Sequence, residues 1–344
     1  MPLLLPITPR PALTQPKLNT AAVVAVFHPR QVKGFPMLHF DIFPSTTDGA
    51  VGMPLGVVLD ACFVVAGNHR GKLVHNTSPH HFVADYKSNQ DTLLRPGYYN
   101  FVVVHEGGEL DDNYGLCACF SAWTPPIAIP DRWKGEGKDA VTLARELPLM
   151  SGGSEVSAAV RTLDKSCIMS GAISGVQASH LVPEDEVDWW DDHYSEIKAY
   201  GGDDEDLTSI INEVAPRADL KMGLDQGLFL FAPYGLDKVI VVVIHAAASD
   251  IAYKFHLREV RFPARILRAY LFIRFAFTVF KSLAPGRRDT ADAIAEARKR
   301  KSTSEGSEDA EDPRHGKRFK EGGGVTARDE RKNTPSSDPD NGHG

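Results

Sequence analysis

The sequence predicts an α+β fold in which two structured domains lie between disordered ends. Segments rich in valine and aromatic residues alternate with Gly, Asp and Asn over residues 21–133, which is typical of a β-rich domain. Residues 134–285 mix strand and helix patterns and are expected to form a second domain. Residues 1–20 are rich in proline and residues 286–344 are polar, so both ends are predicted to be disordered.

The β-rich domain is expected to contain short strands with one or two helices. Strand signals are AAVVAVF from residue 21, YYNFVVV from residue 98 and GLCACFSAW from residue 115. The run GVVLDACFVV from residue 56 is either a strand or a helix that ends near Gly67, because a continuous apolar run fits both. Cys117 and Cys119 would share one face of a strand. None of the four cysteines forms a CxxC pair, which favours free thiols in a reducing compartment.

Two apolar segments stand out in the second domain. Residues 239–245 (VIVVVIH) are predicted to form a buried strand. Residues 266–280 contain Arg268 and Arg274, so this run is expected to be a buried helix and not a membrane span. No membrane partner is therefore predicted.

The charge of the chain is unevenly distributed. The formal net charge is −7, and residues 286–344 carry 13 basic and 13 acidic residues, so the excess negative charge lies upstream. Residues 184–206 hold eleven acidic residues and one basic residue, and they are expected to be a solvated loop. The composition itself does not indicate nucleic-acid binding, which usually needs a basic face.

The strongest pattern begins at residue 166 with SCIMSGAISGVQASHLVP, which contains Cys167, Gly171, His180 and Pro183. Asn212 follows, then RADLK from residue 217, then LD at 224–225, and then the apolar segment FLFAP at 229–233. This order resembles the HNH nuclease domain, of the ββα-metal type, found in a group of fungal proteins. Those proteins read as a Cys, a Thr/Ser-Gly turn and a strand ending in Ala-Ala-His-Ile-Val-Pro. An Asn, an Arg-x-Asp-Leu-His helix, Phe-Asp and an apolar strand follow.

The resemblance implies a ββα-metal (HNH-like) module within residues 134–285 and a metal-dependent endonuclease that hydrolyses phosphodiester bonds in DNA. In such a site His180 is the general base, a role that suits an imidazole at neutral pH. Asn212 fixes the loop and the imidazole, and a histidine on the following helix binds a divalent cation, Mg²⁺ or Zn²⁺. Cys167, Gly171, Pro183 and Arg217 occupy structural positions of the motif.

The chain departs from this pattern at Lys221, where the family has the metal-binding histidine. A lysine has no lone pair at neutral pH and cannot ligate a cation. Asp219 and Asp225 are the candidate replacement ligands, although Asp225 could instead cap a turn. Lys221 is either a solvated helix residue or a phosphate contact. Two functions follow: an endonuclease, active or degenerate, favoured by the His180 segment, or an inactive HNH-fold binding or scaffold protein, favoured by Lys221.

The C-terminal tail contains two basic clusters, RKRK at 298–301 and KRFK at 317–320. Clusters of this kind are typical of a bipartite nuclear-import signal, and they also arise by chance in charged tails. A nuclear location is expected on this basis, and a cytoplasmic one otherwise.

Deleting residues 286–344 is predicted to leave the melting temperature nearly unchanged, because a polar segment with a single aromatic residue buries little apolar surface. Thermal unfolding of the full-length and truncated proteins tests this, and a large drop would show that the tail packs on the folded part. Fusing the tail to a fluorescent reporter tests nuclear import separately, and a reporter that stays in the cytoplasm removes the nuclear assignment.

Overall fold

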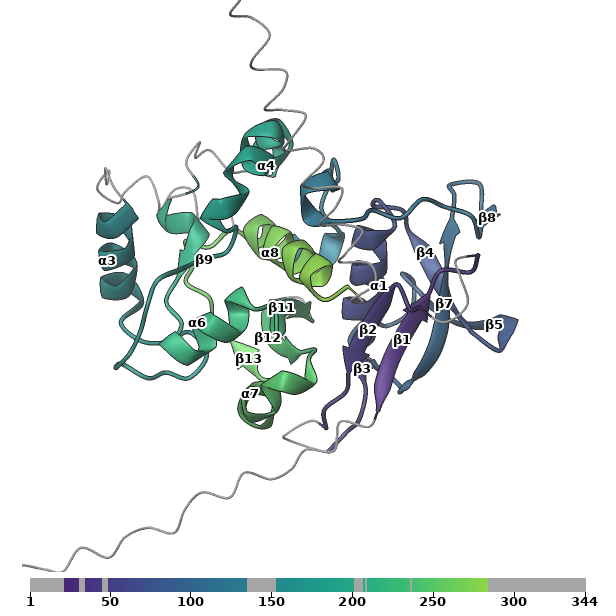
Figure 1. Ribbon diagram of the computed structural model, residues 1–344, viewed down its shortest axis with the longest axis horizontal. Helices are drawn as coiled ribbons and strands as arrows, with labels where there is room; N and C mark the ends of the chain where they lie inside the picture. The colour runs from purple at the N-terminus through teal and green to yellow at the C-terminus, as the bar shows by residue number, and fades with distance from the viewer. Residues whose placement is uncertain are drawn as a thin grey trace, which may run out of the picture. The chain divides into compact units, whose positions relative to one another are not determined.

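A computed structural model describes residues 22–30, 35–44, 49–134, 153–200, 207, 209–235 and 237–283. All of these belong to one compact unit, Met1–Lys299. The fold is α+β with a β-rich N-terminal region, as the sequence predicts (Figure 1). The predictions for residues 1–20 and for the tail from residue 286 lie outside the described residues. The predicted domain boundary at residue 134 adjoins residues 135–152, which also lie outside them.

The N-terminal region is built on a six-stranded sheet with the strand order β2-β1-β7-β4-β5, in which β8 pairs with β7. Strand β1 runs parallel to β7, and the other neighbours are antiparallel. Strands β3 and β6 form a separate short pair. The strands are β1 (Val23–Phe27), β2 (Leu38–Asp41), β3 (Met53–Pro54), β4 (Gly71–His75), β5 (Ser78–Asp85), β6 (Leu93–Leu94), β7 (Gly97–Val104) and β8 (Leu110–Asp111).

The ambiguous apolar run is the helix α1 (Leu55–Val65), all eleven residues of which are buried. It is followed by Gly67 at φ +64°, a backbone conformation that favours glycine. The predicted strand at 115–123 is wrong, because the backbone N–H of Cys117 bonds to the carbonyl of Val65 at the end of α1. A 3₁₀ turn, η1 (Phe120–Ala122), follows.

The C-terminal region holds the antiparallel sheet β11-β12-β13 and the two-stranded antiparallel sheet β9-β10, which is called the hairpin below although α4 and α5 lie between its strands. Strand β12 and helix α8 confirm the buried strand and the buried helix predicted from the sequence. The elements are η2 (Asp131–Trp133), α3 (Gly153–Asp164), β9 (Ser179–His180), η3 (Glu184–Glu186), α4 (Val187–Asp192), α5 (Tyr194–Ala199), η4 (Ile210–Asn212), β10 (Glu213–Val214), α6 (Ala218–Asp225), β11 (Phe229–Tyr234), β12 (Lys238–Val243), η5 (Ala246–Ala248), α7 (Ser249–Phe255), β13 (Glu259–Val260) and α8 (Arg268–Lys281).

The acidic segment that follows β9 is helical where the sequence predicted a loop. Trp189 and Trp190 of α4 are buried, while Asp188, Asp191 and Asp192 of the same helix are exposed. The two tryptophans supply the apolar surface that holds this helix against the core, and the carboxylates remain in water. The last residues of the segment, 201–206, lie outside the described part.

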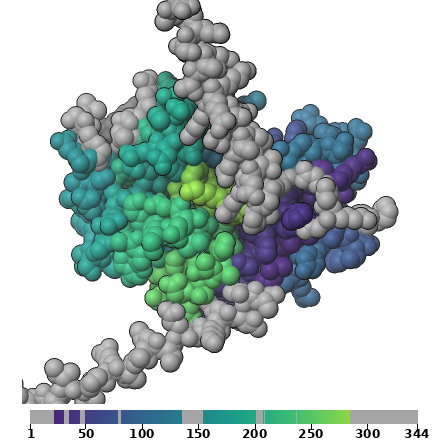
Figure 2. Space-filling model, in the orientation of Figure 1, coloured from purple at the N-terminus to yellow at the C-terminus, as the bar shows by residue number. Residues whose placement is uncertain are grey.

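Helix α8 forms the centre of the unit, and its twelve residues 269–280 are all buried. It contacts β11, α1, η1 and η2 and so joins the N-terminal and C-terminal regions. On the face shown in Figure 2 the yellow-green residues of this part of the chain are visible only as a small patch. Within the described residues every helix is too short or too polar to cross a bilayer, and α8 is a core helix.

A buried ionic cluster also joins the two regions. The carboxylate of Asp60 in α1 accepts a hydrogen bond of 2.7 Å from Nε1 of Trp133 and lies 3.7 Å from Nε of Arg132. Arg132 also donates to the carbonyl of Pro233 in β11. It passes over Gly56, where a Cβ atom would lie 1.1 Å from its Nη1. The missing side chain of Gly56 therefore lets Arg132 reach across α1.

Asp60 should make stability depend on pH in a defined direction. Burial raises the pKa of Asp60 from 3.8 to about 6, against the opposing effects of Arg132 and of the Trp133 hydrogen bond. The folded state then prefers the protonated carboxyl, so stability is lost as the pH rises from about 4 through 6. Relative to wild type, Asp60→Asn should gain up to about 3 kcal/mol in unfolding free energy between pH 4 and pH 7. Urea unfolding across this range measures it, and a constant difference would contradict the prediction.

Candidate functional site

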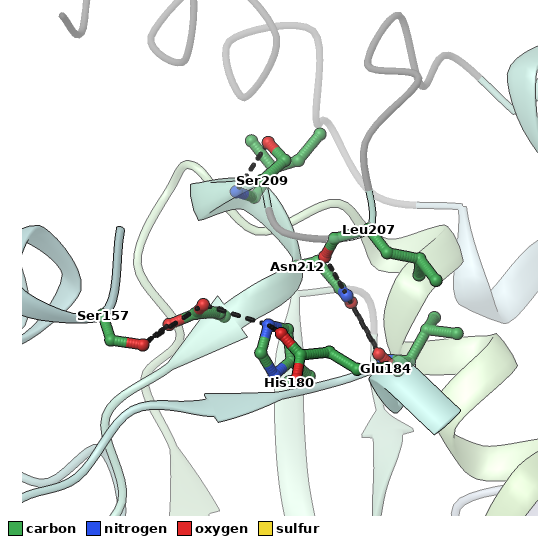
Figure 3. Close-up of polar contacts among 9 residues, drawn as sticks. Ser157, His180, Glu184, Leu207, Ser209 and Asn212 are labelled. Atoms are coloured by element: carbon green, nitrogen blue, oxygen red, sulfur yellow. Dashed lines mark hydrogen bonds and ion pairs between the residues drawn. The ribbon is translucent and has the colours of Figure 1, made fainter. Parts of the chain in front are cut away.

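The His180 segment pairs with a second strand, and Figure 3 shows the polar contacts around His180 and Asn212. In the pair β9-β10, His180 lies opposite Glu213 and Ser179 lies opposite Val214. Helix α6 begins four residues after the hairpin, so the chain order is strand, strand, helix. As the sequence predicts, His180 ends its strand and Asn212 lies beside it, within the 3₁₀ turn η4.

Asn212 braces the chain that follows His180. It is fully buried, and its side-chain oxygen accepts a hydrogen bond of 2.8 Å from the N–H of Val182. Its Nδ2 donates to the carbonyls of Val182 at 3.0 Å and Leu207 at 2.8 Å. These contacts are to the backbone, so Asn212 holds the loop. The expected contact between the side chain of Asn212 and the imidazole of His180 is not among them.

Two carboxylates approach the imidazole of His180 on the same nitrogen. Nε2 lies 3.0 Å from Oε1 of Glu213 and 3.4 Å from Oε1 of Glu184. The side chain of Glu213 is 0% exposed and that of Glu184 is 58% exposed, with His180 at 19%. The imidazole and Glu213 are close enough to pair, although the ring is not turned to align a hydrogen bond. Sequence reasoning missed Glu213, because only the strand register places it opposite His180.

Glu213 is held from behind by Ser157, and the charge of Arg265 acts on it from nearby. The hydroxyl of Ser157 in α3 donates to Oε2 of Glu213 at 3.2 Å. Arg265 is also buried and pairs with Asp164 at 2.8 Å. Burial lowers the pKa of Arg265, while the negative charges of Asp164 and Glu213 act to raise it. A cluster of buried charges therefore lies beneath the hairpin.

The acidic residues proposed as metal ligands are paired with cations on α6. Asp219 accepts two hydrogen bonds of 2.6 Å from Arg217, and these bonds lower the pKa of the Asp219 carboxyl. Lys221 donates to Oδ2 of Asp225 at 2.7 Å, one helical turn away. Each carboxylate of α6 is thus paired with a nearby cation: Asp219 with Arg217, which precedes the helix, and Asp225 with Lys221 within it.

These residues do not fit a divalent cation. No group of three or more His, Cys, Asp or Glu in the described part of the chain is arranged to hold a metal ion. Lys221 occupies the position from which the expected ligand would come, and its partner Asp225 is engaged. The expected Mg²⁺ or Zn²⁺ therefore has no ligand set among the described residues.

Cys167 and Gly171 support the geometry of the hairpin. The sulfur of the buried Cys167 accepts from the backbone N–H of Ser170 at 3.3 Å and of Arg217 at 3.2 Å. Gly171 adopts φ +68°, which closes the turn after Cys167. Cys167 thus ties this turn to the start of α6. Pro183 precedes the 3₁₀ turn η3 and accepts from the N–H of Glu186.

Arg274 of α8 connects both parts of the motif to the core. Its guanidinium donates to the carbonyl of Leu181 after β9, at 3.4 Å, and to the carbonyl of Leu224 in α6, at 2.5 Å. Burial lowers the pKa of Arg274 to about 10, and nearby Asp225 opposes this change, so the side chain stays charged at neutral pH. The hairpin and α6 are therefore fixed to the same buried cation.

Comparisons with family models, with curated proteins and with solved structures gave no match to this chain.

Removing the Asn212 side chain should destabilise the hairpin. Asn212→Ala breaks three buried hydrogen bonds and leaves the N–H and carbonyl of Val182 without partners, at a cost of about 2–4 kcal/mol. Ser179→Ala is the control, because the hydroxyl of Ser179 is equally buried and has no hydrogen-bond partner among the described residues. Urea unfolding compares them, and equal effects would show that Asn212 does not brace the loop.

Proposed function

We propose that this chain is a degenerate HNH-type nuclease, related in fold and in part of its site to enzymes that hydrolyse phosphodiester bonds in DNA. One observation carries the proposal. A strand ending in His180, the bracing Asn212, a second strand and a helix follow each other in the order that the HNH pattern requires. The placement of Cys167 between the turn and α6 supports the same assignment.

The chemistry that the described residues offer is that of a general base. A neutral imidazole at position 180 can take a proton from an attacking water molecule. Asn212 keeps the following loop in place, and Arg274 holds that loop against α8. The described residues provide no ligand set for a cation, so we expect cleavage of DNA to be weak or absent.

A second candidate is a binding or scaffold protein that keeps the HNH fold without catalysis. The ion pair between Lys221 and Asp225 favours it, because this pair stabilises α6 without any ligand. The exposed carboxylates of α4 also oppose contact with DNA, whose affinity comes largely from neutralising phosphates. DNA as the partner and the nucleus as the location remain proposals that rest on the motif and on the basic clusters of the tail.

Lys221→His is predicted to gain metal affinity and DNA cleavage together, because it supplies a ligand of the expected type and releases Asp225 from its ion pair. Plasmid cleavage with Mg²⁺, Mn²⁺ or Zn²⁺, with metal binding measured by calorimetry, tests this. Lys198→His on α5 is a matched control and should change neither quantity. His180→Ala in the Lys221→His background should remove the cleavage gained.

Two results would redirect the proposal. Efficient cleavage by the natural protein, with a lower rate in Lys221→His, would make Lys221 itself a functional group, such as one that holds the phosphate, and the site would not be degenerate. If neither protein binds metal or cuts DNA, the results favour the binding or scaffold function. His180→Ala should then change only the stability of the protein.

A further inference from the structure

Glu213 is a charged side chain that the fold keeps fully buried beside His180. Burying a carboxylate is costly unless hydrogen bonds and opposite charges compensate. Oε1 of Glu213 faces Nε2 of His180 at 3.0 Å, and Oε2 accepts from Ser157 at 3.2 Å. The nearby Arg265 adds a favourable electrostatic interaction. The carboxylate is thus held from behind and presents one oxygen to the imidazole.

We propose that Glu213 is a positioning residue that orients the imidazole of His180 and holds its proton on Nε2. The proposal rests on the general-base role of His180 in the proposed function. A neutral imidazole carries one proton, and a carboxylate beside Nε2 favours the tautomer with that nitrogen protonated. Nδ1 then carries the lone pair, so it is the atom that accepts a proton from water. In Ser-His-Asp triads a carboxylate also orients the catalytic histidine, there through the Nδ1–H, with Nε2 as the base.

Burial decides between the two carboxylates that reach Nε2. Glu213 is fully buried, where the weak screening strengthens its interaction with the imidazole. Glu184 lies at 3.4 Å but is 58% exposed, so water and salt screen its charge. Ser157 further restricts the rotamer of Glu213. Glu213 therefore fixes the imidazole, and Glu184 contributes little.

The N–H of Nε2 and Glu213 are close but not aligned for a hydrogen bond. Catalytic hydrogen bonds are often poorly aligned in ligand-free proteins and tighten when substrate binds. A rotation of the ring about its bond to Cβ would bring the Nε2–H onto Oε1. The separation of 3.0 Å already permits this bond.

Nuclear magnetic resonance of the full-length protein labelled with ¹⁵N-histidine tests the proposal without relying on activity. The signals of His180, one of 13 histidines, are identified by their loss in His180→Gln. At a pH where the ring is neutral, we expect a protonated Nε2 whose hydrogen exchanges slowly with water and resonates downfield. Glu213→Gln should lose the downfield, slowly exchanging signal, whereas the matched variant Glu184→Gln should keep it. Ser157→Ala should speed the exchange.

Each outcome decides the proposal. A wild-type ring protonated on Nδ1, a rapidly exchanging Nε2–H, or equal losses in Glu213→Gln and Glu184→Gln would overturn it. If Glu213→Gln does not fold, as judged by circular dichroism, the wild-type spectrum and Ser157→Ala still decide. Where Lys221→His cleaves DNA, adding Glu213→Gln should reduce the rate about tenfold or more. If no variant cleaves DNA, the catalytic part of the proposed function fails, and the histidine spectrum still tests the pairing.

Discussion

The burial of Arg274 within α8 is the interaction on which the rest of the structure depends. Between Ala269 and Phe280 helix α8 carries one charged side chain, Arg274, and all of these residues are buried, so other elements must enclose the helix. A guanidinium in such a place must find acceptors, since its charge cannot be removed at neutral pH. The carbonyls of Leu181 and Leu224 provide them, and the ring of Phe277 lies 5.2 Å away. The need to satisfy one cation thus sets the positions of both the hairpin and α6.

The N-terminal region completes the enclosure of α8 and is not a separate layer. Buried hydrophobic residues form a continuous cluster from β1 to the end of α8. Polar contacts cross the same boundary: Arg132 bonds to the carbonyl of Pro233, and Nε1 of Trp189 donates to the carbonyl of Trp123 at 2.7 Å. The site is therefore supported by the whole compact unit.

The charged residues around the hairpin are of two kinds: partly exposed ion pairs and a buried carboxylate. The pair Arg217–Asp219 lies at the N-terminus of α6 and the pair Lys221–Asp225 lies within it. Both pairs are partly exposed, and each contributes a fraction of a kcal/mol. Glu213 is buried among polar groups, where an apolar residue of similar size would often be as stable or more so. The buried carboxylate requires another reason, and orienting His180 is one.

The sequence alone determined the elements whose signals are local. Runs of apolar residues predicted β12 and α8, because each run depends on neighbouring residues only. The resemblance to the HNH pattern, and not a local signal, led us to expect His180 at a strand end with Asn212 nearby. Tertiary packing decided that the apolar run at α1 is a helix, and that the acidic segment after β9 folds over its two tryptophans. It alone placed Glu213 against His180, because strand register, Ser157 from α3 and the charge of Arg265 come from distant parts of the chain. No local sequence pattern encodes this contact, because it forms only when β9 and β10 pair.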